Sequence, residues 1–372
     1  MDFNFSDDQE QLRDAVRRWV DKGYDFERRR SIVREDGGFS REAWQDLAEL
    51  GLTGLYVPED EGGMGLGPVD GMVVMEELGR GIVLEPLAQV LIASTLLAGA
   101  PKAVRSLWLP GIASGERLVV LAHQERGARY RLDACETVAT ATAGGGWQVT
   151  GRKQLVAAGD QADGFIVPAM SDGRLSLFIV EAGDDSVRAS GYLTQDGSRG
   201  ADLQFDAAPA ELLYEDGLAA LELGVDIGIA AACAEAVGVM DKTLAATVEY
   251  MNTRKQFGVA ISSFQALRHR VADMKMQLEL ARSMSYYASL KLNAPAEERR
   301  RAMSRAKYQL GVSMRFVGQQ AVQLHGGIGV TDEYIVSHYF KKLTQLDIAF
   351  GDSLHHLGRV SAQMQDTAGV FA

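Results

Sequence analysis

Tyr250-Met-Asn-Thr-Arg254-Lys-Gln-Phe257-Gly258 is the segment that most narrowly restricts the fold of this chain. It follows a long run of helical periodicity, so Tyr250 and Arg254 stand one turn apart on the same helix face. A guanidinium at such a position can hold a pyrophosphate through paired, charge-assisted hydrogen bonds that a lysine could not reproduce. The alternative is a surface arginine paired with Glu249 or another acid, so this segment alone leaves the role of Arg254 open.

A second motif lies about seventy residues further along and reads Gln323-Leu-His-Gly326-Gly327-Ile-Gly329. Its glycines let the backbone approach a cofactor without an intervening side chain. The motif is weak evidence by itself, because any glycine-rich turn between helices has a similar composition. Together with Arg254 at this spacing, the motif is much stronger evidence for a cofactor site than either motif alone.

Two further segments complete the order: Tyr334-Ile-Val-Ser-His-Tyr339 and Ala349-Phe350-Gly351-Asp352. This order of motifs resembles the acyl-CoA dehydrogenase family. In that family the last segment usually carries a Glu followed by Gly and Thr, and the Glu removes the α-proton of the substrate. Counting from Gln323, the position of this Glu falls on Phe350. The resemblance therefore implies that the chain has no catalytic base at the usual place.

The same resemblance implies FAD as the cofactor. In the family, an Arg, a Phe, a Gln and a Gly pair contact the adenosine and pyrophosphate of an FAD that is bound mainly by the neighbouring subunit. The segment Phe264-Gln-Ala-Leu is similar to the family's next helix start and adds Gln265 to these residues. The resemblance therefore implies six cofactor-binding residues: Arg254, Phe257, Gln265, Gln323, Gly326 and Gly327. No metal site is expected.

The resemblance is weaker where the chain's own flavin would lie. Gly151-Arg-Lys-Gln-Leu155-Val-Ala157 resembles the family segment in which a Trp covers the flavin and a Ser or Thr hydroxyl bonds to its reactive nitrogen. Leu155 and Ala157 supply neither group. The earlier family run Thr-Glu-Pro-x-Ala-Gly-Ser-Asp reads His123-Gln-Glu-Arg-Gly-Ala128 here, without its proline and its Ser-Asp ending.

Other carboxylates are weak substitutes for the base. Some family members carry it on the first long helix of the C-terminal domain, but that position corresponds to Gly228. Asp352 is the remaining candidate, because it stands two residues beyond Phe350 on a tight glycine turn. The other nearby acids are expected to be helix-end or solvated carboxylates: Glu222, Asp226 and Asp347. The adjacent His355 and His356 point in different directions on a helix, so they are expected to be surface or interface residues.

Composition restricts the class of protein. The chain has 372 residues, of which 47% are hydrophobic and 24% charged, enough for two or three packed units. A net charge of -12 argues against a nucleic-acid partner, and two cysteines imply neither a disulfide framework nor a metal cluster. The acidic residues 1–8 lack the features of a signal peptide, and no stretch looks long and apolar enough to span a membrane. We therefore expect a soluble cytoplasmic protein.

The periodicity changes twice along the chain. Residues 1–115 have a helical pattern, residues 116–217 contain six short β-prone runs separated by turn residues, and residues 218–372 are helical again. Ser6 and Ser40 precede acidic first turns, as helix N-caps do. The expected fold is α+β and acyl-CoA dehydrogenase-like, with an N-terminal helical domain, a middle β-barrel or sandwich and a C-terminal four-helix bundle.

Residues that would serve a partner's FAD are kept, whereas those that would serve the chain's own flavin and base are replaced. The sequence therefore predicts the base-less subunit of a heteromeric, FAD-dependent acyl-CoA dehydrogenase, resembling the small subunit of the pimeloyl-CoA dehydrogenase type. The expected partners are an acyl-CoA substrate, a related subunit in a heterotetramer or a homo-oligomer, and electron-transfer flavoprotein. Three alternatives stay open: a homomeric dehydrogenase that uses Asp352, a flavin-free structural relative, and an acyl-CoA oxidase. The expected role is degradation of a fatty or dicarboxylic acid whose length the sequence does not define.

Overall fold

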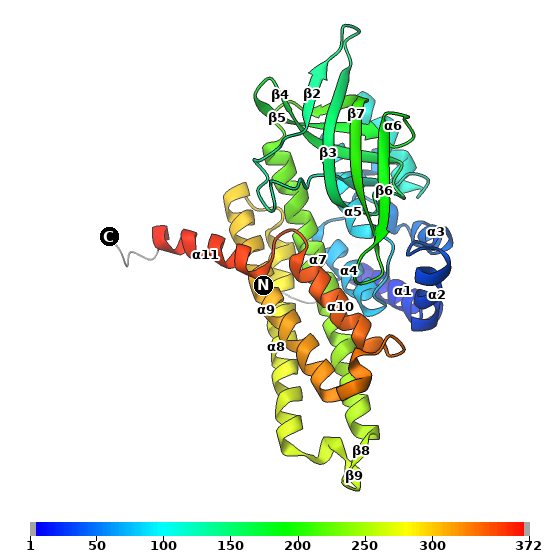
Figure 1. Cartoon of the computed structure of the whole chain (residues 1–372), viewed down its shortest axis with the longest axis vertical. Coiled ribbons are helices and arrows are strands. Elements are labelled where there is room, and N and C mark those ends of the chain that lie inside the picture. The colour runs from blue at the N-terminus through cyan, green and yellow to red at the C-terminus, as the bar shows by residue number, and fades with distance from the viewer. Residues whose placement is uncertain (1–4, 368–372) are drawn as a thin grey trace. The chain divides into compact units, whose positions relative to one another are not determined.

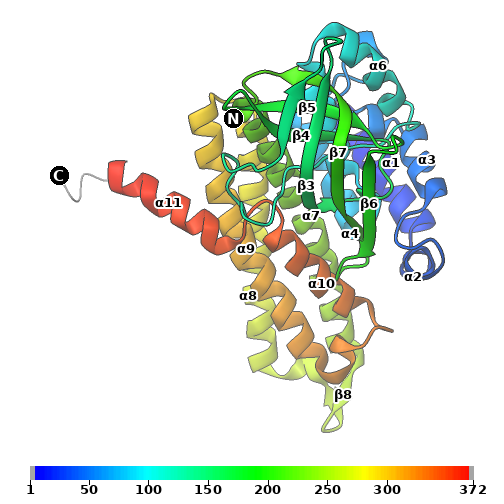
Figure 2. The ribbon, with the colours of Figure 1, turned by 45° about the horizontal axis from the view of Figure 1, so that its top comes forward.

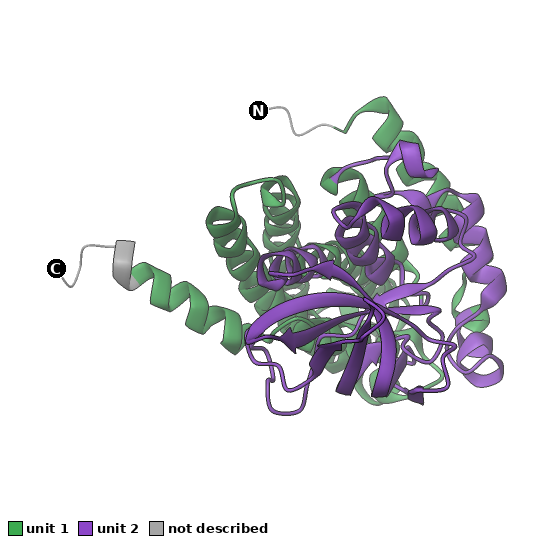
Figure 3. Cartoon of the chain, turned by 90° about the horizontal axis from the view of Figure 1, so that it is seen from above, with its two compact units in different colours: residues 1–28, 68–83, 229–372 green, residues 29–67, 84–228 purple. Residues whose placement is uncertain are grey.

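The computed structural model describes residues 5–367, with side chains up to residue 364. Residues 1–4, part of the acidic stretch used in the signal-peptide prediction, lie outside the described residues. The chain forms two compact units (Figure 3). Unit 1 comprises residues 1–28, 68–83 and 229–372, and unit 2 comprises residues 29–67 and 84–228.

Unit 2 begins with a group of helices, and one of them starts at a predicted N-cap. They are most of α2 (Phe26–Glu35), α3 (Arg41–Glu49), α5 (Leu87–Ala98) and α6 (Lys102–Ala113), with the 3-10 turns Leu52–Gly54 and Glu59–Glu61. The Ser40 hydroxyl accepts a hydrogen bond from the Ala43 amide, so the predicted N-cap of α3 is confirmed. In α5, the run of apolar side chains is almost entirely buried.

A seven-stranded sheet forms the rest of unit 2. Its strands are β1 (Val119–Leu121), β2 (Val138–Ala141), β3 (Trp147–Ala157), β4 (Gly164–Ser171), β5 (Arg174–Glu181), β6 (Val187–Leu193) and β7 (Arg199–Tyr214). The pairings β4–β2, β2–β3, β3–β7, β7–β5 and β5–β4 close on themselves, so these five strands make a barrel (Figure 1). β1 pairs with β4 and β6 pairs with β7 outside this ring.

The six predicted β-prone runs correspond to six of these strands, and β6 was missed. Its residues are mostly exposed, and β6 pairs only with β7, so it lacks the alternation of apolar residues that marks a half-buried strand. β3 and β7 are also longer than expected. They pair antiparallel with register shifts near residues 149–151 and 153–156, and these irregularities hide the strand period in the sequence.

The described part of unit 1 is helical apart from one short hairpin. Its elements are α1 (Asp7–Gly23), α4 (Pro68–Arg80), the larger part of α7 (Leu218–Thr253), β8 (Lys255–Gln256), β9 (Val259–Ala260), α8 (Gln265–Lys291), α9 (Ala296–His325), α10 (Ile335–Ile348) and α11 (Ser353–Thr367). Ser6 and Gln9 form a capping box at the start of α1, as Ser6 predicted. α9 packs against α8, α10 and α11, and its apolar stripe from Ala302 to Val317 is buried (Figures 1 and 2).

The expectation that no segment could span a membrane needs a correction at α7. A window of this helix has a mean hydropathy of 1.7 and is long enough to cross a bilayer, although 94% of the window is buried. Gly238 of α7 explains part of that burial. Gly238 packs so closely on the backbone of Glu76 in α4 that a side chain there would overlap the Glu76 carbonyl. A buried core helix of a folded protein has this composition without crossing a membrane.

Candidate cofactor surface and base-position turn

The segment after α7 forms a tight hairpin. β8 and β9 are joined by Phe257 and Gly258, whose φ angles of 52° and 84° are both positive, as a type I′ turn requires. The side chain of Phe257 is 92% exposed. Its ring meets the ring of Phe264 edge-on, with centroids 6.2 Å apart. The hairpin therefore presents a large apolar side chain to whatever surrounds the chain.

Arg254 stands between α7 and this hairpin. Its amide donates to the Tyr250 carbonyl over 2.8 Å, and its carbonyl accepts from the Ile261 amide over 2.9 Å. The guanidinium is exposed and makes no hydrogen bond or ion pair with any residue between 5 and 367. The alternative pairing with Glu249 does not form. The backbone is thus fixed while the charged group remains available to an anion.

The glycine motif lies at the end of α9. Gly326 follows His325 with φ 65° and ψ −139°, a conformation that in practice only glycine adopts. Gln323, Gly326 and Gly327 are exposed, and open space surrounds both glycines where a side chain would otherwise project. Gln265, the first residue of α8, is exposed too. We call the set Arg254, Phe257, Gln265, Gln323, Gly326 and Gly327 the hairpin–glycine surface.

The segment at the expected base position is a tight turn between α10 and α11. Phe350 has a φ of 57° and Gly351 a φ of 109°. Left-handed backbone costs a bulky L-residue roughly 1–2 kcal/mol, so the surroundings must hold Phe350 in place. Lys307 of α9 donates from Nζ to the carbonyl of Asp347 over 2.7 Å and to that of Gly351 over 3.0 Å. His356 Nε2 bonds to the carbonyl of Phe350 at 3.1 Å.

Burial shifts the pKa of both groups that hold this turn. Loss of solvation lowers the pKa of Lys307 to about 8, even though neighbouring acids favour its charged form. Burial, followed by the charge of Lys307, lowers the pKa of His356 to about 3, so this imidazole is neutral at physiological pH. Since the Phe350 carbonyl can only accept, His356 carries its proton on Nε2.

One expectation about this region was wrong. His356 was expected at the surface or at an interface, but it is buried beneath the turn while the adjacent His355 is half-buried. Asp347 lies at the end of α10, which agrees with the helix-end alternative, and its buried carboxylate accepts from Ser353 Oγ over 2.5 Å and from Arg315 over 3.2 Å. Asp352, the candidate substitute base, accepts the amide of His355 over 2.8 Å and so caps α11.

The residues expected at the chain's own flavin face lie on β3 in unit 2. Leu155 has a φ of 54° and a side chain that is 66% exposed, and its amide donates to Asp202 over 3.2 Å. Ala157 pairs with Gly200 of β7 and carries no hydroxyl. Neither residue offers the aromatic plane or the hydrogen bond that a flavin ring needs there. The residues of β3 therefore lack the groups expected to contact a flavin ring, whereas the hairpin–glycine surface offers an exposed guanidinium and an open glycine turn to an anion.

A buried ion pair lies beside this face. Lys153 of β3 is fully buried and donates from Nζ to Glu125 Oε1 over 2.6 Å. Glu125 also accepts from the hydroxyl of Thr137 over 2.7 Å and from the amide of Glu136 over 2.6 Å. Burial by itself would raise the pKa of Glu125, but the charge of Lys153 and these hydrogen bonds lower it to about 2. The carboxylate is ionised at every physiological pH.

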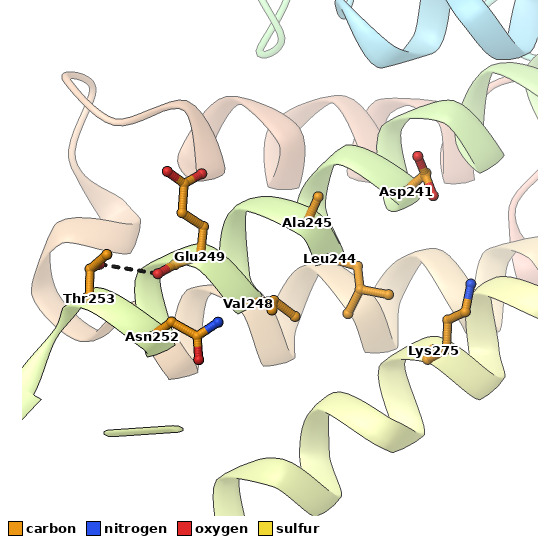
Figure 4. Close-up of a pocket in the computed structure, with 8 residues that line it drawn as sticks. All are labelled: Asp241, Leu244, Ala245, Val248, Glu249, Asn252, Thr253 and Lys275. Carbon is orange, nitrogen blue, oxygen red and sulfur yellow. Dashed lines mark hydrogen bonds between the residues drawn. The ribbon is translucent and has the colours of Figure 1, made fainter. Parts of the chain in front are cut away.

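The structure also has an open pocket on unit 1, between α7 and the middle of α8 (Figure 4). Its volume is about 610 Å³, and its lining is mixed in polarity: Asp241, Leu244, Ala245, Val248, Glu249, Asn252, Thr253 and Lys275. None of the predicted site residues belongs to this set. The pocket therefore adds nothing to the hairpin–glycine surface or to the Phe350 turn.

Sequence reasoning missed the charged groups that support these sites. Lys153 and Lys307 were not singled out, because an isolated lysine is nearly always a surface residue. The only signal for Lys307 was its place on the apolar stripe of α9, next to Ala306. Glu125 was quoted as part of a degenerate motif, but nothing in its spacing indicated that Lys153 lies opposite.

Comparison with known proteins identifies the fold. Residues 6–116 match the acyl-CoA dehydrogenase N-terminal domain, and residues 215–365 match the acyl-CoA dehydrogenase C-terminal domain. The short-chain specific acyl-CoA dehydrogenase of Megasphaera elsdenii is 30% identical to this chain, covering 93% of this chain and 95% of that protein. A chain of the ChsE4–ChsE5 complex from Mycobacterium tuberculosis is 27% identical, with a TM-score of 0.90 over 99% of this chain and 100% of that one.

PigA, solved as an FAD complex, has the same fold at 22% identity, with a TM-score of 0.89 over 98% of this chain and 99% of PigA. These matches confirm the predicted α+β class, with a helical N-terminal domain, a middle β domain and a helical C-terminal domain. The PigA structures contain FAD, the cofactor that the sequence predicts for this chain. The chain belongs to the acyl-CoA dehydrogenase family.

Proposed function

We propose that this chain is the base-less subunit of a heteromeric, FAD-dependent acyl-CoA dehydrogenase, in which it completes the FAD site of a related subunit that carries the catalytic Glu. One contrast carries the proposal. The hairpin–glycine surface is exposed and open, with the guanidinium of Arg254 available. In contrast, Phe350 occupies the base position and Leu155 the flavin face.

The division of roles follows from the chemistry of each position. FAD, held mainly by the partner, would accept the hydride from the β-carbon of the acyl chain. Arg254 would neutralise part of the pyrophosphate charge, and the backbone at Gly326 and Gly327 would approach it closely because neither residue has a side chain. The phenyl group of Phe350 can neither accept nor donate a proton, so removal of the α-proton would fall to the partner's Glu.

Exposed apolar side chains support an assembly of subunits. Several of the large ones lie on the helices and the hairpin of unit 1: Phe257, Met276, Leu280, Leu290, Val330 and Leu354. Burial of these side chains against another chain would remove their apolar surface from water. The related ChsE4–ChsE5 structure is a complex of two differently named subunits, which is the kind of assembly proposed here. We propose a heterotetramer.

The substrate class in this proposal is an acyl-CoA thioester. Resemblance to the pimeloyl-CoA dehydrogenase small subunit favours a dicarboxylic or fatty acyl chain, with electron-transfer flavoprotein as the acceptor and the cytoplasm as the location. A homomeric enzyme that uses Asp352 is less well supported, because the carboxylate of Asp352 already caps α11. A flavin-free relative would have no use for the available guanidinium and open glycine turn of the hairpin–glycine surface.

The proposal is tested by comparing the purified chain with a complex co-expressed with a relative that has Glu at the position of Phe350. We expect the isolated chain to bind FAD weakly and to show little dehydrogenation, and the complex to gain both tight FAD and activity. The matched control is the partner alone. Tight FAD and full activity in the isolated chain would contradict the proposal, as would a partner whose FAD affinity does not change when this chain is added.

A further inference from the structure

The side chain of Tyr250 connects the end of α7 to the glycine turn after α9. Its hydroxyl donates to the backbone carbonyl of His325 over 3.3 Å. The two rings also stack, with centroids 4.4 Å apart and an angle of 26° between their planes. Gly326 follows His325 directly, so these contacts fix the residue from which the glycine turn starts.

Both partners in this contact are themselves held. Tyr250 accepts the amide of Arg254 at its carbonyl, one helical turn away. The ring of His325 is 4% exposed, bonds through Nδ1 to the carbonyl of Ala321 over 2.8 Å and lies 5.2 Å from the ring of Tyr334. Neither ring can move far without disturbing a helix end.

Stacking, rather than a second hydrogen bond, sets the orientation of the His325 ring. Because the Ala321 carbonyl can only accept, the ring proton sits on Nδ1. The other nitrogen, Nε2, is buried and has no hydrogen-bond partner in the described part of the chain. Burial lowers the pKa of this imidazole, and the bond to Ala321 opposes the shift only in part. Tyr250 therefore supplies the contact that keeps the neutral ring in place.

We propose that Tyr250 is a positioning residue that sets the spacing between the guanidinium of Arg254 and the Gly326–Gly327 turn. This inference rests on the proposed function and deepens it. A dinucleotide pyrophosphate would be met by Arg254 from one helix end and by the open backbone of the Gly326–Gly327 turn from another. Two such anchors bind one ligand well only if their separation is fixed before the ligand arrives. Tyr250 reaches both, through its backbone on one side and its ring and hydroxyl on the other.

Three variants separate the parts of this contact. Tyr250→Phe removes the hydroxyl and keeps the stacking, whereas Tyr250→Leu removes both. Tyr308→Phe, the same chemical change on α9, is the control. In hydrogen exchange on the full chain, we expect the amides of residues 326–330 to exchange several-fold faster in Tyr250→Phe and faster again in Tyr250→Leu. Tyr308→Phe should match the wild type, and unchanged exchange in both Tyr250 variants would overturn the inference.

The second readout is the dissociation constant of FAD in the co-expressed complex. Tyr250→Phe should raise it by about 5-fold, the loss expected for one hydrogen bond, while the melting temperature and subunit association stay as in the control. A loosened turn with unchanged FAD affinity would also overturn the inference, because Tyr250 would then be structural only. If the wild-type chain adds no FAD affinity to a partner, the proposed function fails, and hydrogen exchange alone still decides whether Tyr250 positions the turn.

Discussion

The ammonium of Lys307 lies 3.0 Å from the backbone carbonyl of Gly351 and holds the turn that contains Phe350. Its second bond, to the carbonyl of Asp347, spans 2.7 Å on the other side of Phe350. The residue is 1% exposed, so these two carbonyls replace the water that would otherwise solvate the charge. A neutral lysine retains two N–H donors, so loss of the proton would alter stability without releasing the turn.

The pH dependence of stability should therefore report on Lys307. Its pKa is about 8 in the folded chain against 10.5 for the free side chain, so the unfolded chain binds more protons between these values. Stability contributed by this group must rise as the pH increases from 8 to 10.5. In urea unfolding, we expect the free energy of unfolding of the wild type to rise over this pH range by on the order of 2–3 kcal/mol more than that of Lys307→Met, which cannot titrate. A difference that stays flat or falls would contradict this assignment.

Substitutions of Asp352 should separate helix capping from catalysis. Asn caps helices about as well as Asp, so Asp352→Asn should leave stability nearly unchanged, whereas Asp352→Ala should lose about 1 kcal/mol. Because Asp352 is not the proposed base, neither change should lower the kcat of the assembled enzyme by more than about 2-fold. Chemical denaturation and steady-state kinetics on the same preparations check both parts. Abolished activity in Asp352→Asn would identify Asp352 as the base and support the homomeric alternative.

Removing the carboxylate of Glu125 should destabilise the barrel. Glu125→Gln leaves the buried ammonium of Lys153 without its counter-charge, a change that costs roughly 3–5 kcal/mol in buried pairs. The pKa of Glu125 is lowered from 4.5 to about 2, so its contribution is complete above pH 4.5 and is lost as the pH falls toward 2. The difference in the free energy of unfolding between wild type and Glu125→Gln, measured with urea, should therefore become smaller at acid pH. Adding Lys153→Met to Glu125→Gln should recover part of the stability at pH 7, and no recovery would argue against the pair.

The parts of the site that could be predicted are those that depend only on residues close together in the sequence. Arg254 and the pair Phe257-Gly258 follow a helix end at fixed spacing, and Gly326 marks a backbone conformation that other residues avoid. Such features need no knowledge of distant residues. The buried stripe of α9 was readable for the same reason, because a period of 3.6 residues is a property of one helix.

The supporting groups could not be predicted, because each depends on residues far apart in sequence. Lys307 is separated by some forty residues from the carbonyls that it binds, and Lys153 by 28 residues from Glu125. Only the folded chain shows that these charges are buried and paired. His356 was expected at the surface or at an interface because it is adjacent to His355. Adjacent residues on a helix point in different directions, but this does not tell which of the two directions is buried.

A substitution at Phe257 should separate the stability of the chain from its association. Phe257 stands in the left-handed region before Gly258, and Asn followed by Gly is the pair that type I′ turns favour. Phe257→Asn should therefore leave the melting temperature of the isolated chain unchanged or slightly raised. The proposed complex buries this ring, so the loss of its apolar surface should weaken association with the Glu-bearing subunit by roughly tenfold or more. Leu107→Asn, an exposed apolar residue on α6 of unit 2, is the control and should associate normally. Equal affinities for wild type and Phe257→Asn in analytical ultracentrifugation would place the hairpin outside the interface.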